Sequence, residues 1–126
     1  MSDEHILFIS AGASIDKTYA ITAEELKPTH VVVLAEESIF HDYEADTDFL
    51  KLEKPKIRQA IEGVRQRVEL DGRREFALVQ LPKLDQDIIR GTILKIRNEH
   101  KEAEFSFNVT GGTALFSTSL FLMAIW

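Results

Sequence analysis

Two short segments of small and hydroxyl-bearing residues are the parts of this 126-residue sequence best suited to bind a ligand. The first is S-A-G-A-S at residues 10–14, and the second is T-G-G-T at residues 110–113. Glycine lets a backbone approach a ligand closely and adopt a positive φ. Where such a segment leads into a helix, the unpaired N–H groups of the first turn carry a partial positive charge. Both segments therefore indicate binding of a phosphate or a similar small anion.

Known phosphate-binding motifs do not account for either segment. The first contains one glycine, Gly12, where the dinucleotide fingerprint G-x-G-x-x-G has three. No Walker A lysine follows either segment, which excludes a P-loop. A Gly-Gly turn is also an ordinary link between a strand and a helix, so the local pattern leaves both interpretations open.

Strands and helices alternate along the predicted chain. Runs of apolar and β-forming residues predict strands at residues 6–9, 31–35, 76–81 and 105–109. Helical periodicity predicts helices at about residues 15–27, 55–71, 84–100 and 114–126. We expect Pro55 in the first turn of the second helix and Gly72 just after its end. The acidic stretch between residues 36 and 53 is long for a loop, so we expect a helical turn or two within it.

This order of elements predicts a single α/β domain over residues 1–126, with a Rossmann-like doubly wound, mostly parallel sheet and helices on both faces. The predicted strand order is third, second, first, fourth. Ligands bind such sheets at the carboxyl ends of the strands that flank the reversal in order. The two small-residue segments meet there, which predicts a pocket lined by Ser10, Ala11, Gly12, Ala13 and Ser14 and by Thr110, Gly111, Gly112 and Thr113.

Composition excludes several classes of function. The chain has no cysteine, so it has no disulfide, no thiolate nucleophile and no cysteine-based zinc site. Its formal net charge of −6 argues against direct binding of duplex nucleic acid. The N-terminus lacks the pattern of a secretory signal, and the apolar run at residues 114–126 is shorter than the roughly 20 residues that span a bilayer. We therefore expect a cytoplasmic protein. Because the sequence ends inside this apolar helix, we expect a module truncated from a longer protein or a helix covered by a partner.

The segment N-V-T-G-G-T at residues 108–113 resembles the N/D-x-T-G-G-T signature of the CARF domains, the CRISPR-associated Rossmann-fold family. The small segment after the first strand and the order of elements are similar too. The resemblance implies a homodimer that binds a cyclic oligoadenylate, such as cyclic tetra-adenylate, across its two-fold axis in type III CRISPR antiviral defence. It also implies that the signal passes to a fused effector, such as a nuclease, a DNA-binding domain or a membrane segment.

Transferred residue by residue, the resemblance places Ser10, Gly12 and Ser14 in the first ligand loop. It also adds Asn108 to the second loop, beside residues 110–113. Many members of the family have a lysine directly after G-G-T, and here that residue is Ala114. The substitution removes a cation beside the phosphates and puts in doubt any cleavage that needs one.

Three functions remain open on this basis. The first is a ligand-sensing domain without catalytic activity of its own, needing neither cofactor nor metal. The second is a ring nuclease, in which Ser10 and backbone N–H groups position and stabilise the reacting phosphate without metal. The third is the sensing domain of a CARF transcription regulator.

Other chemistry-bearing residues receive a structural interpretation. The histidines His5, His30, His41 and His100 are scattered through the sequence. His41 with the acidic residues at positions 42–48 could bind a metal, but a solvated acidic loop is the preferred interpretation. Arginines at positions 65, 67, 73 and 74 are expected to interact favourably with the end of the second helix.

Overall fold

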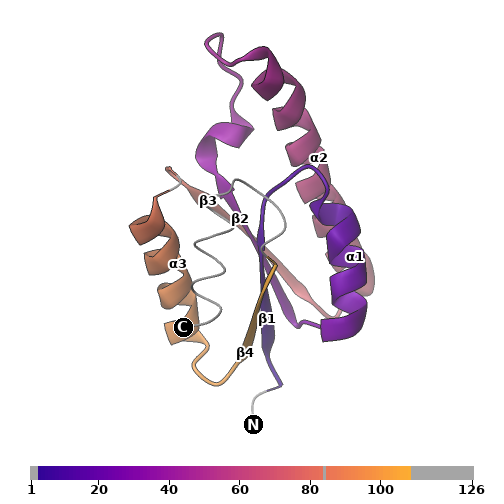
Figure 1. Cartoon of the computed structure of the whole chain (residues 1–126). Coiled ribbons are helices and arrows are strands. Elements are labelled where there is room, and N and C mark those ends of the chain that lie inside the picture. The colour runs from indigo at the N-terminus through magenta and orange to yellow at the C-terminus, as the bar shows by residue number, and fades with distance from the viewer. Residues whose placement is uncertain (1–2, 84, 109–126) are drawn as a thin grey trace.

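The computed structural model describes residues 3–83 and 85–108. Four parallel strands form one sheet in the order β3-β2-β1-β4 (Figure 1), as the sequence predicted. The strands are β1 (His5–Ser10), β2 (His30–Glu36), β3 (Glu75–Leu81) and β4 (Glu104–Asn108). The helices are α1 (Ile15–Leu26), the short 3-10 helix η1 (Glu37–Phe40), α2 (Asp48–Asp71) and α3 (Gln86–Glu99). The fold is therefore α/β and Rossmann-like, with helices on both faces of the sheet.

The sheet separates two hydrophobic cores. Alternation along β1 sends Leu7 and Ile9 to the face covered by α1 and α2, and Ile6 and Phe8 to the face covered by α3. Figure 1 shows these helices on opposite sides of the sheet. Because β1 and β2 are apolar on both faces, their continuous hydrophobic runs fit the centre of a parallel sheet.

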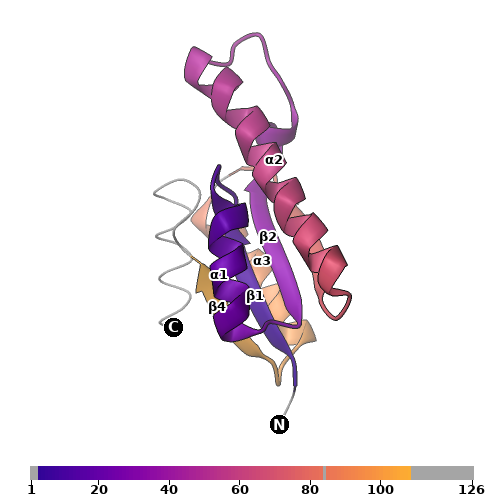
Figure 2. The ribbon, with the colours of Figure 1, turned by 90° about the vertical axis from the view of Figure 1, so that its right-hand side faces the viewer.

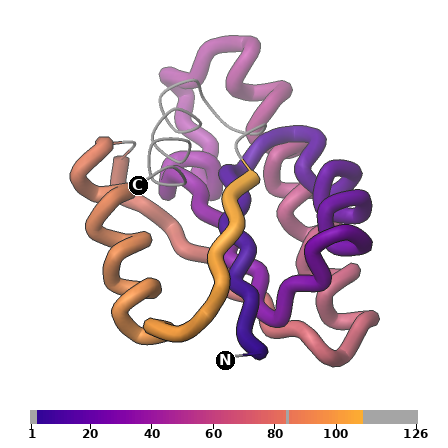
Figure 3. The backbone as a smooth tube through the Cα atoms, turned by 60° about the horizontal axis from the view of Figure 1, so that its bottom comes forward, coloured from indigo at the N-terminus to yellow at the C-terminus, as the bar shows by residue number. Residues whose placement is uncertain are grey.

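β4 joins the sheet beside β1 through aromatic contacts as well as backbone pairing. Phe8 is paired in register with Phe107, and their rings are stacked with centroids 5.2 Å apart. The Phe105 ring is also stacked with that of Phe8, with centroids 6.2 Å apart. Figure 3 follows the backbone from α3 into β4 and shows the last described strand lying beside β1. These contacts fix the register that brings Asn108 next to the end of β1.

Contrary to the prediction, Pro55 lies well inside α2 and not in its first turn. The helix begins at Asp48, where the Thr47 hydroxyl accepts a hydrogen bond from Leu50 N–H at 3.2 Å. It ends as predicted at Gly72, which has a φ of 71° and donates its N–H to the Val68 carbonyl. The predicted helical turns between residues 36 and 53 are η1 and the first turns of α2.

The beginning of α2 stands away from the sheet. Figures 1 and 2 both show residues 41–47 and the first turns of α2 projecting beyond the edge where β1 and β2 end. Two predicted features, the T-G-G-T segment at residues 110–113 and the apolar helix at residues 114–126, lie outside the described residues.

Candidate ligand-binding edge of the sheet

Ser10 and Asn108 lie side by side at the carboxyl-terminal edge of the sheet. Ile9 is the register partner of Asn108, so Ser10 is the next residue along β1. Ser10 is fully buried and Asn108 is 8% exposed. The structure therefore brings together a polar residue of the first segment and Asn108, which the family resemblance added to the second, at the reversal in strand order.

Backbone hydrogen bonds hold the first segment against the sheet. Ala11 N–H donates to the Leu34 carbonyl at 2.9 Å, which extends the pairing with β2 by one residue. Ala11 is buried, whereas Ala13 and Ser14 are exposed. The segment thus leaves the sheet between Ala11 and Ala13, and its exposed residues are those closest to the start of α1.

Ser14 is the N-cap residue of α1, but among the described residues its side chain makes no capping hydrogen bond. Its carbonyl instead accepts hydrogen bonds from the Thr18 N–H and hydroxyl, both at 3.3 Å. Because no side chain caps this 12-residue helix, N–H groups of its first turn can donate hydrogen bonds to an anion. Asp16 lies in the same turn, where its carboxylate favours the helix but repels an approaching phosphate.

Lys54 organises the acidic segment that follows η1, and the sequence analysis did not identify it. The residue is 4% exposed, and its Nζ donates to Asp46 Oδ2 at 2.7 Å and to the His41 carbonyl at 2.9 Å. The Nζ also lies 4.7 Å from the centre of the Tyr43 ring. The hydrogen bond from Lys54, followed by one from the Tyr43 N–H, lowers the pKa of Asp46 below its ordinary value.

Arg58, one helical turn after Lys54, binds the same segment. Its guanidinium donates to the Ile39 carbonyl at 3.0 Å and to Asp42 at 3.2 Å. Asp42 and Asp46 are therefore paired with cations from α2. Residues 41–45 are exposed, as expected for a solvated acidic loop, and the contacts from Lys54 and Arg58 hold the loop against α2. Helical spacing could have identified Lys54, because it lies three residues before Ile57 and seven before Ile61 and so shares the inward face of α2 with them. A helix predicted to begin at Pro55 does not include Lys54.

Three of the four arginines near the end of α2 form local ion pairs, whereas the sequence predicted interactions with the end of the helix; the last turn of α2 contains no basic residue. Arg74 binds Asp71 at 2.7 Å and the Pro28 carbonyl at 2.8 Å, and Arg73 binds Asp71 at 3.1 Å. These contacts lower the pKa of Asp71, with the hydrogen bond from Arg73 as the largest cause. Arg65 pairs with Glu62 within α2. These contacts thus stabilise the connection between α2 and β3.

The histidines are less scattered in space than in sequence. Glu4, His30 and His100 meet at the amino-terminal edge of the sheet, opposite the candidate ligand edge, with potential ligand atoms within 4.8 Å of one another. Among the described residues, this is the group able to hold a metal ion. No helix in the described ranges has the length and apolar character needed to cross a membrane.

The fold is that of a Rossmann-like α/β domain, with the buried polar residues Ser10 and Asn108 at its strand-order reversal. No protein-family model matches the sequence, and no curated protein matches it. Among solved structures, the chain is similar to Can2 from Sulfobacillus thermosulfidooxidans, whose structure was determined in complex with cyclic tetra-adenylate. The match has a TM-score of 0.60 and 14% sequence identity and covers 94% of this chain. The chain spans 28% of the length of that Can2 chain, so the likeness concerns the fold of one part of it.

Proposed function

We propose that this chain is a cyclic oligoadenylate sensor domain of the CARF type, acting in the cytoplasm in type III CRISPR defence. Cyclic tetra-adenylate is the proposed ligand, bound across a homodimer. The observation that carries the proposal is the meeting of Ser10 and Asn108 at the reversal in strand order. The T-G-G-T sequence, which begins two residues after the end of β4, and the fold shared with a protein solved with cyclic tetra-adenylate support it.

In this proposal neutral donors bind the phosphates. Residues 12–14 and the first turn of α1 offer backbone N–H groups, and the second segment offers the backbone and hydroxyls of residues 110–113. A lysine directly after the second segment is absent, because that residue is Ala114. With Asp16 close to the first turn of α1, we expect moderate affinity and a weak dependence on salt.

Ser10 receives a positioning role in this proposal. Its side chain is fully buried, next to a buried Asn108, so it is suited to shape the pocket floor and to hold the two segments together. An attacking or proton-transferring hydroxyl needs direct access to the reacting phosphate. The burial of Ser10 therefore argues against Ser10 itself as the attacking group, and the positioning role is compatible with both a sensor and a ring nuclease.

Titration of the chain with cyclic tri-, tetra- and hexa-adenylate, and with linear tetra-adenylate as a control, tests the proposal by calorimetry. We expect one cyclic form to bind in preference to the linear form. In Gly112→Val the new side chain should block close approach of the ligand, and the affinity should fall by at least about tenfold, or 1.4 kcal/mol. Gly91→Val in α3, where an added Cβ meets nothing within 4 Å, is the matched control and should bind as the parent does.

Chromatography of the ligand after incubation separates sensing from cleavage. Recovery of the intact ring supports a sensor, whereas linear products that disappear in Ser10→Ala would establish the ring nuclease. If folded Gly112→Val binds every oligoadenylate like the parent, the site lies elsewhere on the molecule.

A further inference from the structure

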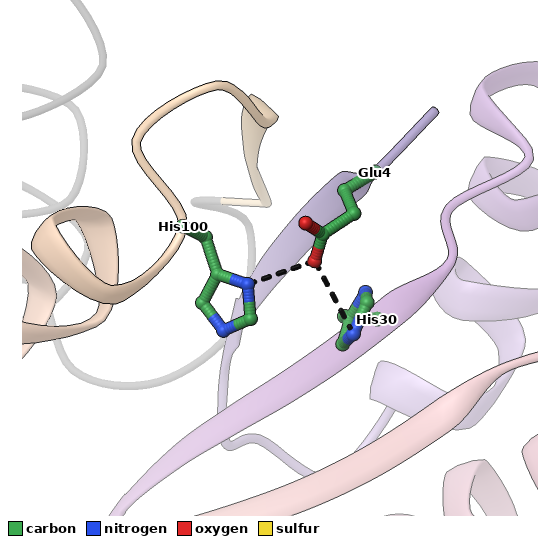
Figure 4. A group of neighbouring side chains, drawn as sticks. All are labelled: Glu4, His30 and His100. Atoms are coloured by element: carbon green, nitrogen blue, oxygen red, sulfur yellow. Dashed lines mark hydrogen bonds and ion pairs between the residues drawn. The ribbon is translucent and has the colours of Figure 1, made fainter. Parts of the chain in front are cut away.

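Three segments distant in sequence bring metal-binding side chains together at the amino-terminal edge of the sheet. Glu4 precedes β1, His30 is the first residue of β2, and His100 follows α3. Figure 4 shows the Glu4 carboxylate between the two imidazole rings. Glu4 Oε2 lies 2.8 Å from His100 Nδ1 and 3.7 Å from His30 Nε2. One carboxylate oxygen is thus shared by two ring nitrogens.

The hydroxyl of Thr29 determines which nitrogen of His30 faces this group. Thr29 Oγ1 donates its proton to the His5 carbonyl at 3.2 Å and accepts the His5 N–H at 2.9 Å. It therefore accepts a hydrogen bond from His30 Nδ1, 2.8 Å away. With the proton on Nδ1, a neutral His30 presents the lone pair of Nε2 to the cluster, which is the form that binds a metal.

That lone pair faces negative charge on two sides. His30 Nε2 lies 3.7 Å from Glu4 Oε2 and 3.2 Å from Glu75 Oε2. A neutral nitrogen between two carboxylates is unfavourable unless a cation lies among them. The arrangement is therefore electrostatically suited to a cation in the centre of the cluster.

His100 adds a further reason for a cation. It is the C-cap residue of α3, and its N–H donates to the Ile96 and Arg97 carbonyls. The partial negative charge at the end of this 14-residue helix therefore lies beside the cluster. The His30 and His100 ring centres are 5.3 Å apart, so both rings border the same small space.

From this geometry we propose a divalent metal site formed by Glu4 Oε2, His30 Nε2 and His100 Nδ1, with Zn²⁺ as the ion that suits it best. Two imidazole nitrogens and one carboxylate oxygen are a common zinc ligand set, with bonds of about 2.0–2.1 Å. Ligand atoms around such an ion lie roughly 3.3 Å apart in a tetrahedron, and the three atoms here lie within 4.8 Å of one another. The hydrogen bond between His100 and Glu4 would open to admit the ion.

Access and coordination number agree with an exchangeable ion. The side chains of His30, His100 and Glu4 are 21%, 29% and 41% exposed, so an aqueous ion reaches them without unfolding. Water or Glu75 supplies the fourth ligand. The ion would join the starts of β1 and β2 to the end of α3, and so stabilise the amino-terminal edge independently of the proposed oligoadenylate site.

The experiment uses the full chain without an affinity tag, freed of metal with a chelator and titrated with zinc chloride. We expect micromolar or tighter binding of one ion per chain and a melting temperature higher by roughly 5–10 °C at a hundredfold excess over Kd. Cobalt chloride should give the visible absorption of a tetrahedral site. In His100→Gln and in Glu4→Gln the zinc affinity should fall by at least about tenfold.

His41→Gln is the matched control, because His41 is an exposed histidine outside the cluster. Its zinc affinity should equal that of the parent. The proposal is overturned if the parent binds no zinc at micromolar concentration while circular dichroism shows it folded. It is also overturned if folded His100→Gln and Glu4→Gln bind zinc as tightly as the parent.

Discussion

At the scale of single residues, Lys54 has the most unusual environment in the described part of the chain. Its ammonium group is buried beneath residues 41–47 and reaches a carboxylate, a backbone carbonyl and the face of Tyr43. Arg58 adds a second cation on the same side of α2. A segment rich in acidic residues is therefore held in one conformation beside the carboxyl-terminal edge of the sheet.

This arrangement predicts loss of order at low pH. The pKa of Asp46 is lowered in the folded protein, chiefly by the hydrogen bond from Lys54, so the folded state binds fewer protons than the unfolded state near pH 4. The stabilisation is present above the unfolded pKa of about 4 and is lost as the pH falls through the lowered folded value. An NMR titration that follows the Tyr43 amide, which donates to Asp46 Oδ2 at 3.1 Å, should show a transition below pH 4.

Two variants test the assignment of this transition. Asp46→Asn should remove the transition at the Tyr43 amide, because no carboxylate remains to titrate there. Glu44→Gln, an exposed change in the same segment, should leave it in place. A transition that persists unchanged in folded Asp46→Asn would show that another group controls the segment.

At the scale of elements, the packing of α2 on α1 depends on Gly63. A Cβ added at Gly63 would lie 3.1 Å from the Cβ of Asp16, in the first turn of α1. That turn is the one that we propose to face the ligand. The distance between the two helices at this point therefore helps to place the anion-binding end of α1.

Two Gly→Ala substitutions should separate helix propensity from packing. At Gly91 in α3 an added Cβ meets nothing within 4 Å, so Gly91→Ala should raise the free energy of unfolding by roughly 0.5–1 kcal/mol. Gly63→Ala gains the same propensity but must displace Asp16, so it should stabilise less. Gly63→Leu should destabilise by about 1–3 kcal/mol through overpacking. Urea denaturation measures all three, and equal gains from the two alanine variants would contradict the close contact.

The sequence was sufficient for the elements whose signals are local. Apolar runs predicted β1 and β2, and the crossover lengths predicted a parallel sheet in the observed order. The start of α2 was misjudged because Pro55 is a strong local signal for a helix beginning, whereas the Thr47 cap depends on one hydroxyl. Lys54 contacts Asp46, eight residues earlier, and Arg58 contacts Ile39, 19 residues earlier. These contacts hold the segment before Pro55, and a local sequence pattern does not reveal them.

For the candidate site, position at the end of β1 selected Ser10, and the resemblance to the N/D-x-T-G-G-T signature selected Asn108. The structure places both residues at one edge of the sheet. The cluster of Glu4, His30 and His100 was not predictable, because its members are spread over almost the whole described chain and meet only when the starts of the strands are aligned. The assignment of residues 110–113 to the ligand site remains a prediction, since they lie outside the described residues.

At the scale of the whole molecule, the prediction concerns assembly. The sequence at residues 114–126 is mostly apolar and includes Phe116, Leu120, Phe121 and Met123. Its predicted helix has more apolar surface than one sheet face covers, and an uncovered patch of this kind marks an interface. In an isologous dimer the same patch is repeated from both chains, which would place two copies of residues 110–113 together for a two-fold symmetric ligand.

We therefore expect a homodimer without ligand and one cyclic tetra-adenylate bound per two chains. Light scattering at micromolar concentration measures the oligomeric state, and calorimetry measures the number of ligands bound per chain. Leu120→Glu should give a monomer and, because each half of the pocket loses its partner, should lower the affinity by at least about a hundredfold, or 2.7 kcal/mol. Leu52→Glu places the same charge on a leucine of α2 that is 66% exposed, and should change neither property. A monomeric parent with and without ligand would refute the dimer, and a folded monomeric Leu120→Glu that binds with full affinity would show that one chain holds the whole site.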